Sequence, residues 1–255
     1  MPEAIDNVGG TRPQRDSANW AFFPLFPAIS GTVQWITGVT TQIALIMSAK
    51  VLWLLAIWAF LAFQRQYLPS APLWLGAAFV ALNPGAIYAN AGYTEPLFLL
   101  LACLSLTAMR QNKPVLAGTV GAMLSATRAV GVGIGLTFAA YALSQVIRGS
   151  DVKISKLVFA GLLIPLGLAG YMVFLHFYVG DALAFSHIQR TWDRELSSPL
   201  RHIENGLRGS SYSSIMVLTA LIGFLLAGYL TVKGELGLAL FLLFATAIPL
   251  STGTT

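Results

Sequence analysis

The sequence predicts an all-α fold, that of a polytopic membrane protein with about eight transmembrane helices. Of its 255 residues, 56% are hydrophobic and only 10% are charged, whereas soluble domains carry about 25% charged residues. The mean hydropathy is +0.72, and apolar stretches long enough to cross about 30 Å of hydrocarbon recur along the chain. Because unpaired backbone amides are costly in lipid, and no stretch alternates as a barrel strand does, these stretches are predicted to be helices.

Eight candidate spans are placed by their length, their lack of charge and the proline and glycine residues between them. They are Thr41–Phe63, Pro72–Ala89, Glu95–Met109, Pro114–Thr127, Ala129–Ile147, Lys156–Val179, Ser213–Thr231 and Glu235–Leu250. Residues 1–40 are then an outer-face segment and 41–179 a transmembrane helical core. Residues 180–212 form an outer-face loop with an amphipathic interfacial helix, and 213–255 further transmembrane helices.

The distribution of basic residues predicts the orientation in the membrane. Short turns on one side hold most of the isolated cations, namely Arg65, Arg110, Lys113, Arg148, Lys153, Lys156 and Lys233. The positive-inside rule makes this side cytoplasmic. The turn at Tyr93, Arg128 and the loop 180–212 fall on the other side, so we expect any chemistry on the outer or lumenal face. The net charge of +5 is spread without a basic run, and it therefore does not indicate a nucleic-acid partner.

The first unusual segment, residues 19–27, reads NWAFFPLFP. Two prolines three residues apart disfavour a continuous helix, so the segment is predicted to be a rigid, partly buried turn at the membrane interface. Aromatic residues at headgroup depth are also ordinary in membrane proteins. The segment therefore becomes informative only together with the others.

The second segment, Asn83–Pro96, reads NPGAIYANAGYTEP. Its Pro-Gly pair interrupts one span near its end, and Thr94 or Glu95 is expected to cap the next helix. Glu95 has a structural explanation, since a carboxylate is favoured at a helix N-terminus. The functional alternative is that two broken helix ends present Tyr93, Glu95 and Asn90 to a cavity.

The third segment, Ser125–Gly135, contains an arginine between long apolar stretches. Arg128 is costly there unless it meets a carboxylate, a phosphate or water, which makes it the strongest candidate for a functional residue. The alternative is a turn residue whose side chain reaches the headgroups. Gly131 and Gly135 form a GxxxG pattern that favours close helix packing. Lys50, within the first span, is a weaker case of the same kind.

The fourth segment, Gly180–Arg194, reads GDALAFSHIQRTWDR. Asp181 is expected to be an N-cap. An amphipathic interfacial helix is predicted by apolar residues at i, i+3, i+7 and i+11, namely Phe185, Ile188, Trp192 and Leu196. Gln189 lies on the apolar side and needs a polar partner, for which a sugar hydroxyl is one candidate. His187 is expected to be a surface residue rather than a base, because no nearby Cys, Ser or second His completes a site.

Several classes of chemistry lose support. The single cysteine, Cys103, lies in an apolar run, so the chain has neither an internal disulfide nor a CxxC motif. The sequence also lacks GxxxxGK[ST], a GxGxxG opening a helix, HExxH and GxSxG. ATP hydrolysis, dinucleotide binding, zinc proteolysis and lipase chemistry are therefore not indicated.

Taken in order, FFPLFP, NPGAIYANAGYTEP, SATRAVG and GDALAFSHIQRTW resemble the PIG-V-like mannosyltransferases, the GPI mannosyltransferase 2 family and its prokaryotic relatives. That family belongs to the GT-C class, and the resemblance covers Trp20 to Arg194. It implies an inverting transfer of mannose or another hexose, without metal or cofactor, from a polyprenyl-phosphate sugar to a lipid or glycan acceptor. The implied location is the cell membrane of a prokaryote or the endoplasmic reticulum membrane of a eukaryote.

Such a transfer needs a base for the acceptor hydroxyl and a cation for the departing phosphate. Glu95 is the candidate catalytic residue, either as the base or by orienting the acceptor. The candidate substrate-binding residues are Tyr93, Arg128, Asp181, Gln189, Trp192 and Arg194. Arg128 or the arginines of the loop are expected to hold the phosphate by bidentate hydrogen bonds.

The sequence departs from the family pattern at both ends. The family opens with a further membrane helix and a Trp-Asp motif whose Asp is the expected base, whereas only Asp6 and Asp16 precede FFPLFP here, in other contexts. The family also continues to an Arg-Tyr motif, and this sequence ends at Thr255. We therefore expect the sequence to be a fragment, which leaves its own activity open.

Two other functions remain open. A transporter or flippase for a lipid-linked sugar is the main alternative, because broken helices and a buried arginine occur in transporters too. Against it, the sequence has no internal repeat and its polar segments lie near one face rather than at the midplane. The third possibility is a non-catalytic scaffold, which the missing Trp-Asp motif suggests. An assay of sugar transfer from a polyprenyl donor separates the enzyme from both.

Overall fold

A computed structural model describes residues 20–82, 84–189, 198–208 and 211–251 of the chain. Within these residues the regular structure is entirely helical and contains no strand, as the composition predicts. Three helical spans of the described chain are long and apolar enough to cross a membrane, namely Thr41–Tyr67, Ala129–Ile147 and Ile154–Val179. The described chain thus has helices of the kind that membrane proteins use.

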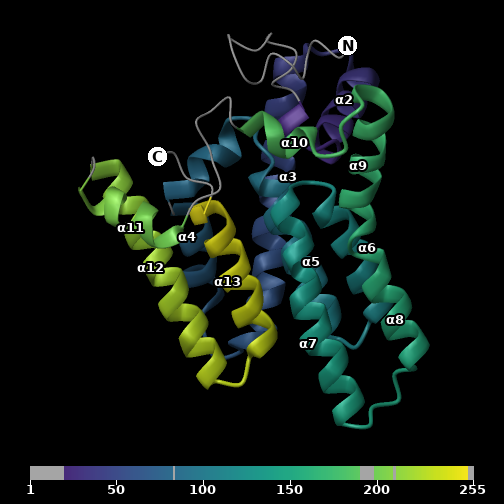
Figure 1. The fold of residues 1–255 in the computed structure, drawn as a ribbon, viewed down its shortest axis with the longest axis vertical. Coiled ribbons are helices and arrows are strands. Elements are labelled where there is room, and N and C mark those ends of the chain that lie inside the picture. Colours follow the sequence, from purple (N-terminus) through teal and green to yellow (C-terminus); the bar gives the residue numbers. More distant parts are fainter. Residues whose placement is uncertain (1–19, 83, 190–197, 209–210, 252–255) are drawn as a thin grey trace. The chain divides into compact units, whose positions relative to one another are not determined.

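From α2 to α10, the helices follow one another along the chain with short connections (Figure 1). They are α2 (Leu25–Thr37), α3 (Thr41–Tyr67), α4 (Leu73–Leu82), η3 (Pro84–Asn90), α5 (Glu95–Arg110), α6 (Pro114–Ser125), η4 (Ala129–Gly133), α7 (Ile134–Ile147), α8 (Ile154–Leu163), α9 (Leu166–Val179), α10 (Ala184–His187), α11 (Pro199–Arg208), α12 (Ser211–Val232) and α13 (Leu236–Ser251). Every predicted span overlaps at least one of these helices. Several of them, such as α4 and α6, are shorter than a full membrane crossing requires.

The chain divides into two compact units. We call the first the N-terminal unit; it comprises Phe23–Phe138 and Ala142–Gly170. We call the second the C-terminal unit; it comprises Ala139–Tyr141 and Tyr171–Thr255, together with the segment up to Phe22. Each unit is described by itself below.

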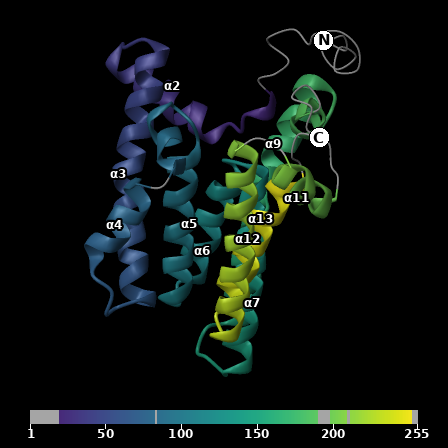
Figure 2. The same cartoon turned by 90° about the vertical axis from the view of Figure 1, so that its left-hand side faces the viewer.

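In the N-terminal unit, α3 packs along α5, α5 packs against α6, and α2 and α4 flank α3 (Figure 2). The buried face of α3 consists mostly of small residues spaced by three or four positions, namely Ala44, Ser48, Ala49, Leu52, Ala56 and Ala59. Small side chains let two helix backbones approach closely, which is how helices associate where lipid removes the hydrophobic driving force. The composition of α3 therefore explains its extensive contact with α5.

Helices α6 and α8 approach even more closely, through glycine. A Cβ atom built on Gly118 would overlap the backbone carbonyl of Ala160, so these two backbones are in direct contact. The predicted close packing at the GxxxG pattern is confirmed in part, because a Cβ atom on Gly131 of η4 would overlap the backbone carbonyl of Leu124 in α6. Gly135 makes only ordinary van der Waals contact with Ile164. Close backbone approaches therefore occur at Gly118 and at Gly131, but not at Gly135.

The span Ile154–Val179 is broken between α8 and α9, next to Pro165. The fully buried hydroxyl of Ser125 contacts both sides of this break. Its Oγ donates to the carbonyl of Ile164 at 2.6 Å and accepts from the backbone N–H of Leu168 at 3.2 Å. One hydroxyl from α6 thus satisfies two backbone groups that a continuous helix would have paired with each other.

Segment 19–27 differs from its prediction, because its second half is helical rather than a turn. Helix α2 begins at Leu25, with Pro24 as its N-cap and Pro27 in its first turn. The first backbone N–H groups of a helix have no partner within the helix, so proline is tolerated there. The helix ends at Gly38, whose φ of 70° closes the C-terminus in the left-handed conformation. Burial of the aromatic residues is confirmed in part, since Phe23 and Phe26 are buried and Phe22 is exposed.

In the C-terminal unit, α12 and α13 form a helical hairpin, and α11 contacts both of them (Figure 1). A Cβ atom on Gly223 of α12 would come within 2.8 Å of the Thr246 hydroxyl on α13, so this pair is also closely packed. The hairpin turns at Gly234, whose φ is +79°. Helix α11 is polar on one side, where Glu204 and Arg208 form an ion pair at 2.9 Å.

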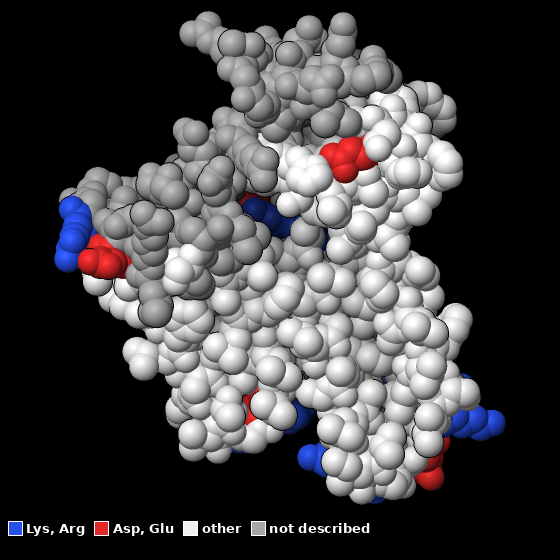
Figure 3. All heavy atoms as spheres, viewed as in Figure 1, with Lys and Arg blue, Asp and Glu red and all other residues white. Residues whose placement is uncertain are grey.

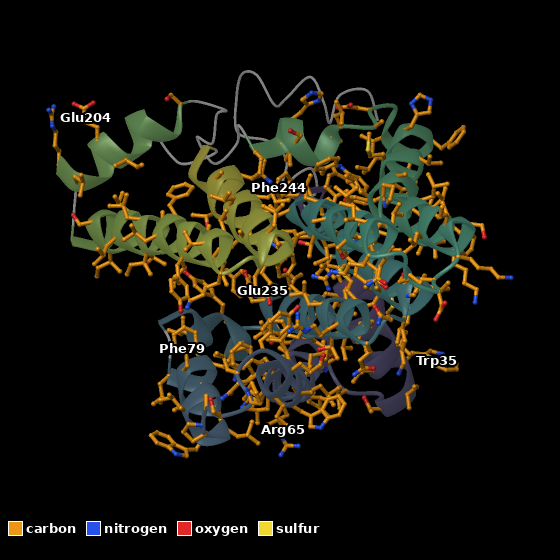
Figure 4. The ribbon with its side chains drawn as sticks, turned by 90° about the horizontal axis from the view of Figure 1, so that it is seen from below. Trp35, Arg65, Phe79, Glu204, Glu235 and Phe244 are labelled. Carbon is orange, nitrogen blue, oxygen red and sulfur yellow. The ribbon has the colours of Figure 1, made fainter. Side chains whose placement is uncertain are left out.

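The described surface is largely apolar along the sides of the helices. Large hydrophobic residues such as Trp35, Phe79 and Phe177 are 70% to 85% exposed, and Trp35 points away from the ribbon (Figure 4). In Figure 3 the sides of the helices carry hardly any charged atoms, and the Lys, Arg, Asp and Glu side chains lie near the helix ends. This distribution suits helices whose sides face lipid.

Candidate functional site

Three of the segments singled out in the sequence meet at one end of the N-terminal unit. The backbone N–H of Leu25 donates to the carbonyl of Ala126 at 3.4 Å, which joins the start of α2 to the end of α6. Gly92, with φ of +73°, lies against Leu45 near the start of α3. Within this unit, the breaks before α2, before α5 and after α6 therefore lie at the same end, as the sequence predicts.

Local backbone structure places Glu95 and Arg128 at this end. Glu95 is the first residue of α5, with Thr94 as N-cap and a proline next in the first turn, as predicted. Arg128 has an extended backbone, with φ of −160° and ψ of 147°, and is the N-cap of η4. A cation is disfavoured at a helix N-terminus, and a carboxylate is favoured there. Arg128 therefore needs a nearby anion more than an ordinary surface arginine does.

Glu95 supplies that anion. Its Oε1 atom accepts a hydrogen bond from Nη1 of Arg128 at 2.6 Å, across 33 residues of sequence. The Arg128 side chain is 47% exposed and that of Glu95 is 34% exposed, so the pair remains accessible to a ligand. The expectation that Arg128 meets a carboxylate, a phosphate or water is thus confirmed for the carboxylate.

The second carboxylate oxygen of Glu95 is in a different environment. Oε2 is buried and makes no hydrogen bond with the described protein atoms. A buried acceptor without a partner is costly and is uncommon in folded proteins. The carboxylate thus has one oxygen engaged with Arg128 and one acceptor position unused.

Tyr93 lies two residues before Glu95 and is 46% exposed. Its ring packs edge-on against Tyr88, with a centroid distance of 5.5 Å and an interplanar angle of 85°. This contact ties η3 to the loop that precedes α5. Of the predicted site residues in the N-terminal unit, the structure therefore brings Glu95 and Arg128 into contact. Tyr93 lies two residues before Glu95 in the chain. The side chain of Asn90 lies outside the described part.

The other end of the N-terminal unit contains the basic turns. The guanidinium of Arg110 lies over the ring of Tyr67 at 4.6 Å, so the end of α5 adjoins the end of α3. Nε2 of Gln145 donates to Oδ1 of Asn112 at 2.8 Å, which adds the end of α7 to this group. The sequence-based division into a basic side and a side with broken helix ends thus holds within this unit.

A second polar pair lies in the C-terminal unit, just after α9. Oδ2 of Asp181 is 2.6 Å from Nδ1 of His187, and Oδ1 accepts from the backbone N–H of Leu183 at 2.9 Å. Burial alone would raise the pKa of the Asp181 carboxyl, but the hydrogen bonds from His187 and Leu183 and the charge of His187 lower it overall. The sequence missed His187 as the partner of Asp181. The available signal was that an aspartate often accepts a hydrogen bond from the backbone N–H two residues later. Such a turn folds the chain back and brings residues that follow it close to the aspartate.

The helix predicted to begin at Asp181 differs in detail. The N-cap of α10 is Leu183, and Asp181 instead holds the turn before it. Helix α10, Ala184–His187, covers four residues of the predicted amphipathic helix, whose residues from 190 on lie outside the described part. Ile188 is buried, as the apolar spacing predicts. The amide of Gln189 donates to the carbonyl of Phe185 at 3.4 Å, so its polar partner is a neighbouring backbone group.

Aromatic contacts hold the start of the described chain against α9 within the C-terminal unit. The Tyr171 hydroxyl lies 2.8 Å from the carbonyl of Trp20 and 3.1 Å from that of Phe22. The Trp20 ring packs edge-on against Tyr178 at 5.5 Å. Tyr171 also packs against Phe185 at 6.2 Å. The first and fourth segments of the sequence analysis are therefore linked through one face of α9.

Two predicted substrate-binding residues, Trp192 and Arg194, lie outside the described residues. Comparisons of the chain with family models, with curated proteins and with solved structures found no match.

Proposed function

We propose that the protein is a membrane glycosyltransferase that moves a hexose, mannose by resemblance, from a polyprenyl-phosphate sugar to a lipid or glycan acceptor. The observation that carries the proposal is the Glu95–Arg128 ion pair at the end of the N-terminal unit where the broken helix ends converge. A carboxylate and a guanidinium in contact are the two groups that this reaction needs. Nothing in the described residues favours the transporter or the scaffold over this function.

In the proposed reaction, the acceptor hydroxyl oxygen attacks the anomeric carbon of the sugar. The new carbon–oxygen bond forms as the bond from that carbon to the phosphate oxygen breaks, and polyprenyl phosphate leaves with the bonding electrons. Glu95 takes the proton of the hydroxyl, and Arg128 stabilises the charge that develops on the departing phosphate. Attack opposite the leaving group inverts the anomeric configuration, as the family resemblance implies.

We infer that the shorter apolar helices also cross the membrane, giving about eight crossings with the basic turns in the cytoplasm. Helices of 10 to 17 residues are shorter than the roughly 20 residues of a full crossing. Local thinning of the bilayer and the flanking 3-10 segment η3 make up the difference for α4. The Glu95–Arg128 pair would then face the outer or lumenal side.

The test is a transfer assay with the full chain in proteoliposomes that contain a polyprenyl-phosphate mannose labelled in the sugar, together with membrane lipids as acceptors. The measurement is the release of polyprenyl phosphate and the appearance of label in a new product. Arg128→Ala is expected to reduce transfer at least a hundredfold, because removing one preorganised donor to the developing charge costs this much in other enzymes. Expression should be unchanged.

Arg148→Ala is the matched control, since Arg148 is exposed in the same unit at the C-cap of α7. It should transfer at the wild-type rate. Full transfer activity of the Arg128→Ala variant would show that Arg128 is not part of the catalytic site. Movement of intact donor across the bilayer, without release of polyprenyl phosphate, would show a flippase instead.

A further inference from the structure

The Glu95–Arg128 contact uses only part of each group. A guanidinium has five N–H donors in a planar fork, and the contact engages one of them, on Nη1. The carboxylate engages Oε1 and leaves Oε2 buried without a hydrogen bond. The contact therefore leaves both residues with unused hydrogen-bonding capacity at the same place.

A carboxylate and a phosphate compete for the same edge of an arginine. Both present oxygen atoms that match the spacing of the guanidinium N–H groups, and both are bound by charge-assisted hydrogen bonds. In the structure, Glu95 Oε1 holds the Nη1 position at 2.6 Å. A phosphate that binds Arg128 through the same edge must therefore displace Glu95.

We propose that the Arg128 guanidinium is a phosphate-binding site whose resting occupant is the Glu95 carboxylate, and that an incoming polyprenyl phosphate group displaces this carboxylate. The inference rests on the proposed function and adds a regulation of its site. While Arg128 is without substrate, Glu95 is paired and does not act as a base. Once Arg128 binds the phosphate, Oε1 of Glu95 is released and can accept the proton of the acceptor hydroxyl.

The exposure of the pair makes this exchange feasible. Ion pairs between partly exposed side chains are weak, because water screens them and ordering the side chains costs entropy. A phosphate monoester carries more charge and more acceptor oxygens than a carboxylate, so it competes well for the guanidinium. The phosphodiester of the sugar donor matches a carboxylate in charge and in free oxygens, so it competes with Glu95 on equal terms. Because Glu95 competes with the ligand, removing its charge should strengthen phosphate binding even though it removes the proposed base.

The experiment measures binding of a short-chain polyprenyl monophosphate to the purified full chain in nanodiscs, by quenching of intrinsic tryptophan fluorescence. Inorganic phosphate is titrated in parallel, so that recognition of a lipid headgroup is distinguished from recognition of free phosphate. Glu95→Gln is expected to lower the dissociation constant about two- to fivefold, which corresponds to the strength of one partly exposed ion pair. Arg128→Gln is expected to raise it at least tenfold.

Two controls separate exchange from a general effect of charge. Asp151→Asn removes an exposed carboxylate from the turn between α7 and α8 of the same unit, and it should leave binding unchanged. In the Arg128→Gln background, Glu95→Gln should no longer tighten binding, because no guanidinium remains to be released. Tightening that persists in this background would overturn the proposal, as would unchanged or weaker binding by Glu95→Gln alone.

Transfer activity distinguishes this inference from the function on which it rests. If the Glu95→Gln variant binds the probe more tightly and transfers no sugar, the result agrees with both the exchange and the proposed transferase function. A wild-type chain that transfers sugar while Glu95→Gln shows no gain in affinity overturns the exchange alone. A wild-type chain that binds the probe with the expected variant pattern, yet never releases polyprenyl phosphate from the donor, overturns the proposed transferase function.

Discussion

At the residue scale, Arg128 and Glu95 each explain the position of the other. Arg128 lies at the N-terminus of η4, where a cation is disfavoured, and Glu95 lies at the N-terminus of α5, where a carboxylate is favoured. Their contact at 2.6 Å offsets the unfavourable position of the arginine. The structural explanation of Glu95 therefore holds, and the contact with Arg128 adds a partner that the helix N-terminus alone does not require.

The Asp181 carboxyl gives a prediction about pH. Its pKa is lowered below the ordinary value of 3.8 in the folded chain, so its contacts stabilise the fold above that value and this stability is lost as the pH falls through the lowered pKa. Asp181→Asn should therefore destabilise the chain near neutral pH by about 1 kcal/mol, the usual net value of one hydrogen bond. The measurement is the melting temperature in detergent between pH 7 and pH 3.

The difference between wild type and Asp181→Asn should shrink as the pH falls below about 3.8, because the unfolded wild-type chain then binds a proton that the folded carboxylate resists. Asp151→Asn serves as the control, because Asp151 is exposed. An Asp181→Asn variant that melts with wild type at pH 7 would show that the Asp181–His187 contact does not hold the turn. A difference that stays constant to pH 3 would exclude the carboxylate charge as its cause.

The sequence predicted individual site residues better than their contacts. The cost of an arginine among apolar residues identified Arg128, and the helix-capping pattern identified Glu95, because both depend on local chemistry. Their contact joins residues 33 positions apart, and no local pattern contains that information. His187 was missed for a similar reason, since its role depends on the fold of the Asp181 turn rather than on a neighbouring nucleophile.

At the element scale, the break between α8 and α9 depends on one hydroxyl. Ser125→Ala would leave the carbonyl of Ile164 and the N–H of Leu168 without their partner. Buried backbone groups without hydrogen bonds cost about 1–3 kcal/mol, so we expect Ser125→Ala to destabilise the chain by this amount. The measurement is again the melting temperature in detergent, with the denaturant midpoint as a second probe.

Ser105→Ala is the matched control for this substitution. Ser105 is as completely buried as Ser125, but its hydroxyl only donates to the carbonyl of Ala117. Its loss should cost about 1 kcal/mol, less than the loss of Ser125. Equal effects of the two substitutions would mean that the break in the span is held by Pro165 alone.

The positions of the helices could be predicted from the sequence because long apolar stretches and proline–glycine breaks are local features. The start of α2 could not, because proline is compatible both with a turn and with the first turn of a helix. The contacts between helices could not be predicted from the sequence either. Close approaches occur at Gly118 and Gly131 but not at Gly135, because the backbone that a glycine meets is set by tertiary packing.

At the scale of the whole molecule, the positive-inside rule predicts which helix ends face the cytoplasm. The N-terminal unit supports the division, since Arg110 and Asn112 lie at one end and Arg128 with Glu95 at the other. The sequence assigns the turn after α12 to the basic side through Lys233. This assignment concerns the C-terminal unit, and it can be tested independently of the assignment for the N-terminal unit.

Cysteine accessibility tests this topology directly. The only native cysteine, Cys103, is buried and can be replaced by alanine to give a background without reactive thiols. Single cysteines are then introduced at three exposed positions: Gln111, Val232 and Ala91. A membrane-impermeant maleimide applied to intact cells should label Ala91→Cys, whereas Gln111→Cys and Val232→Cys should react only after the membrane is opened. Labelling of Gln111→Cys from outside would invert the orientation and place the Glu95–Arg128 pair on the cytoplasmic side, where the proposed outer-face acceptor is absent.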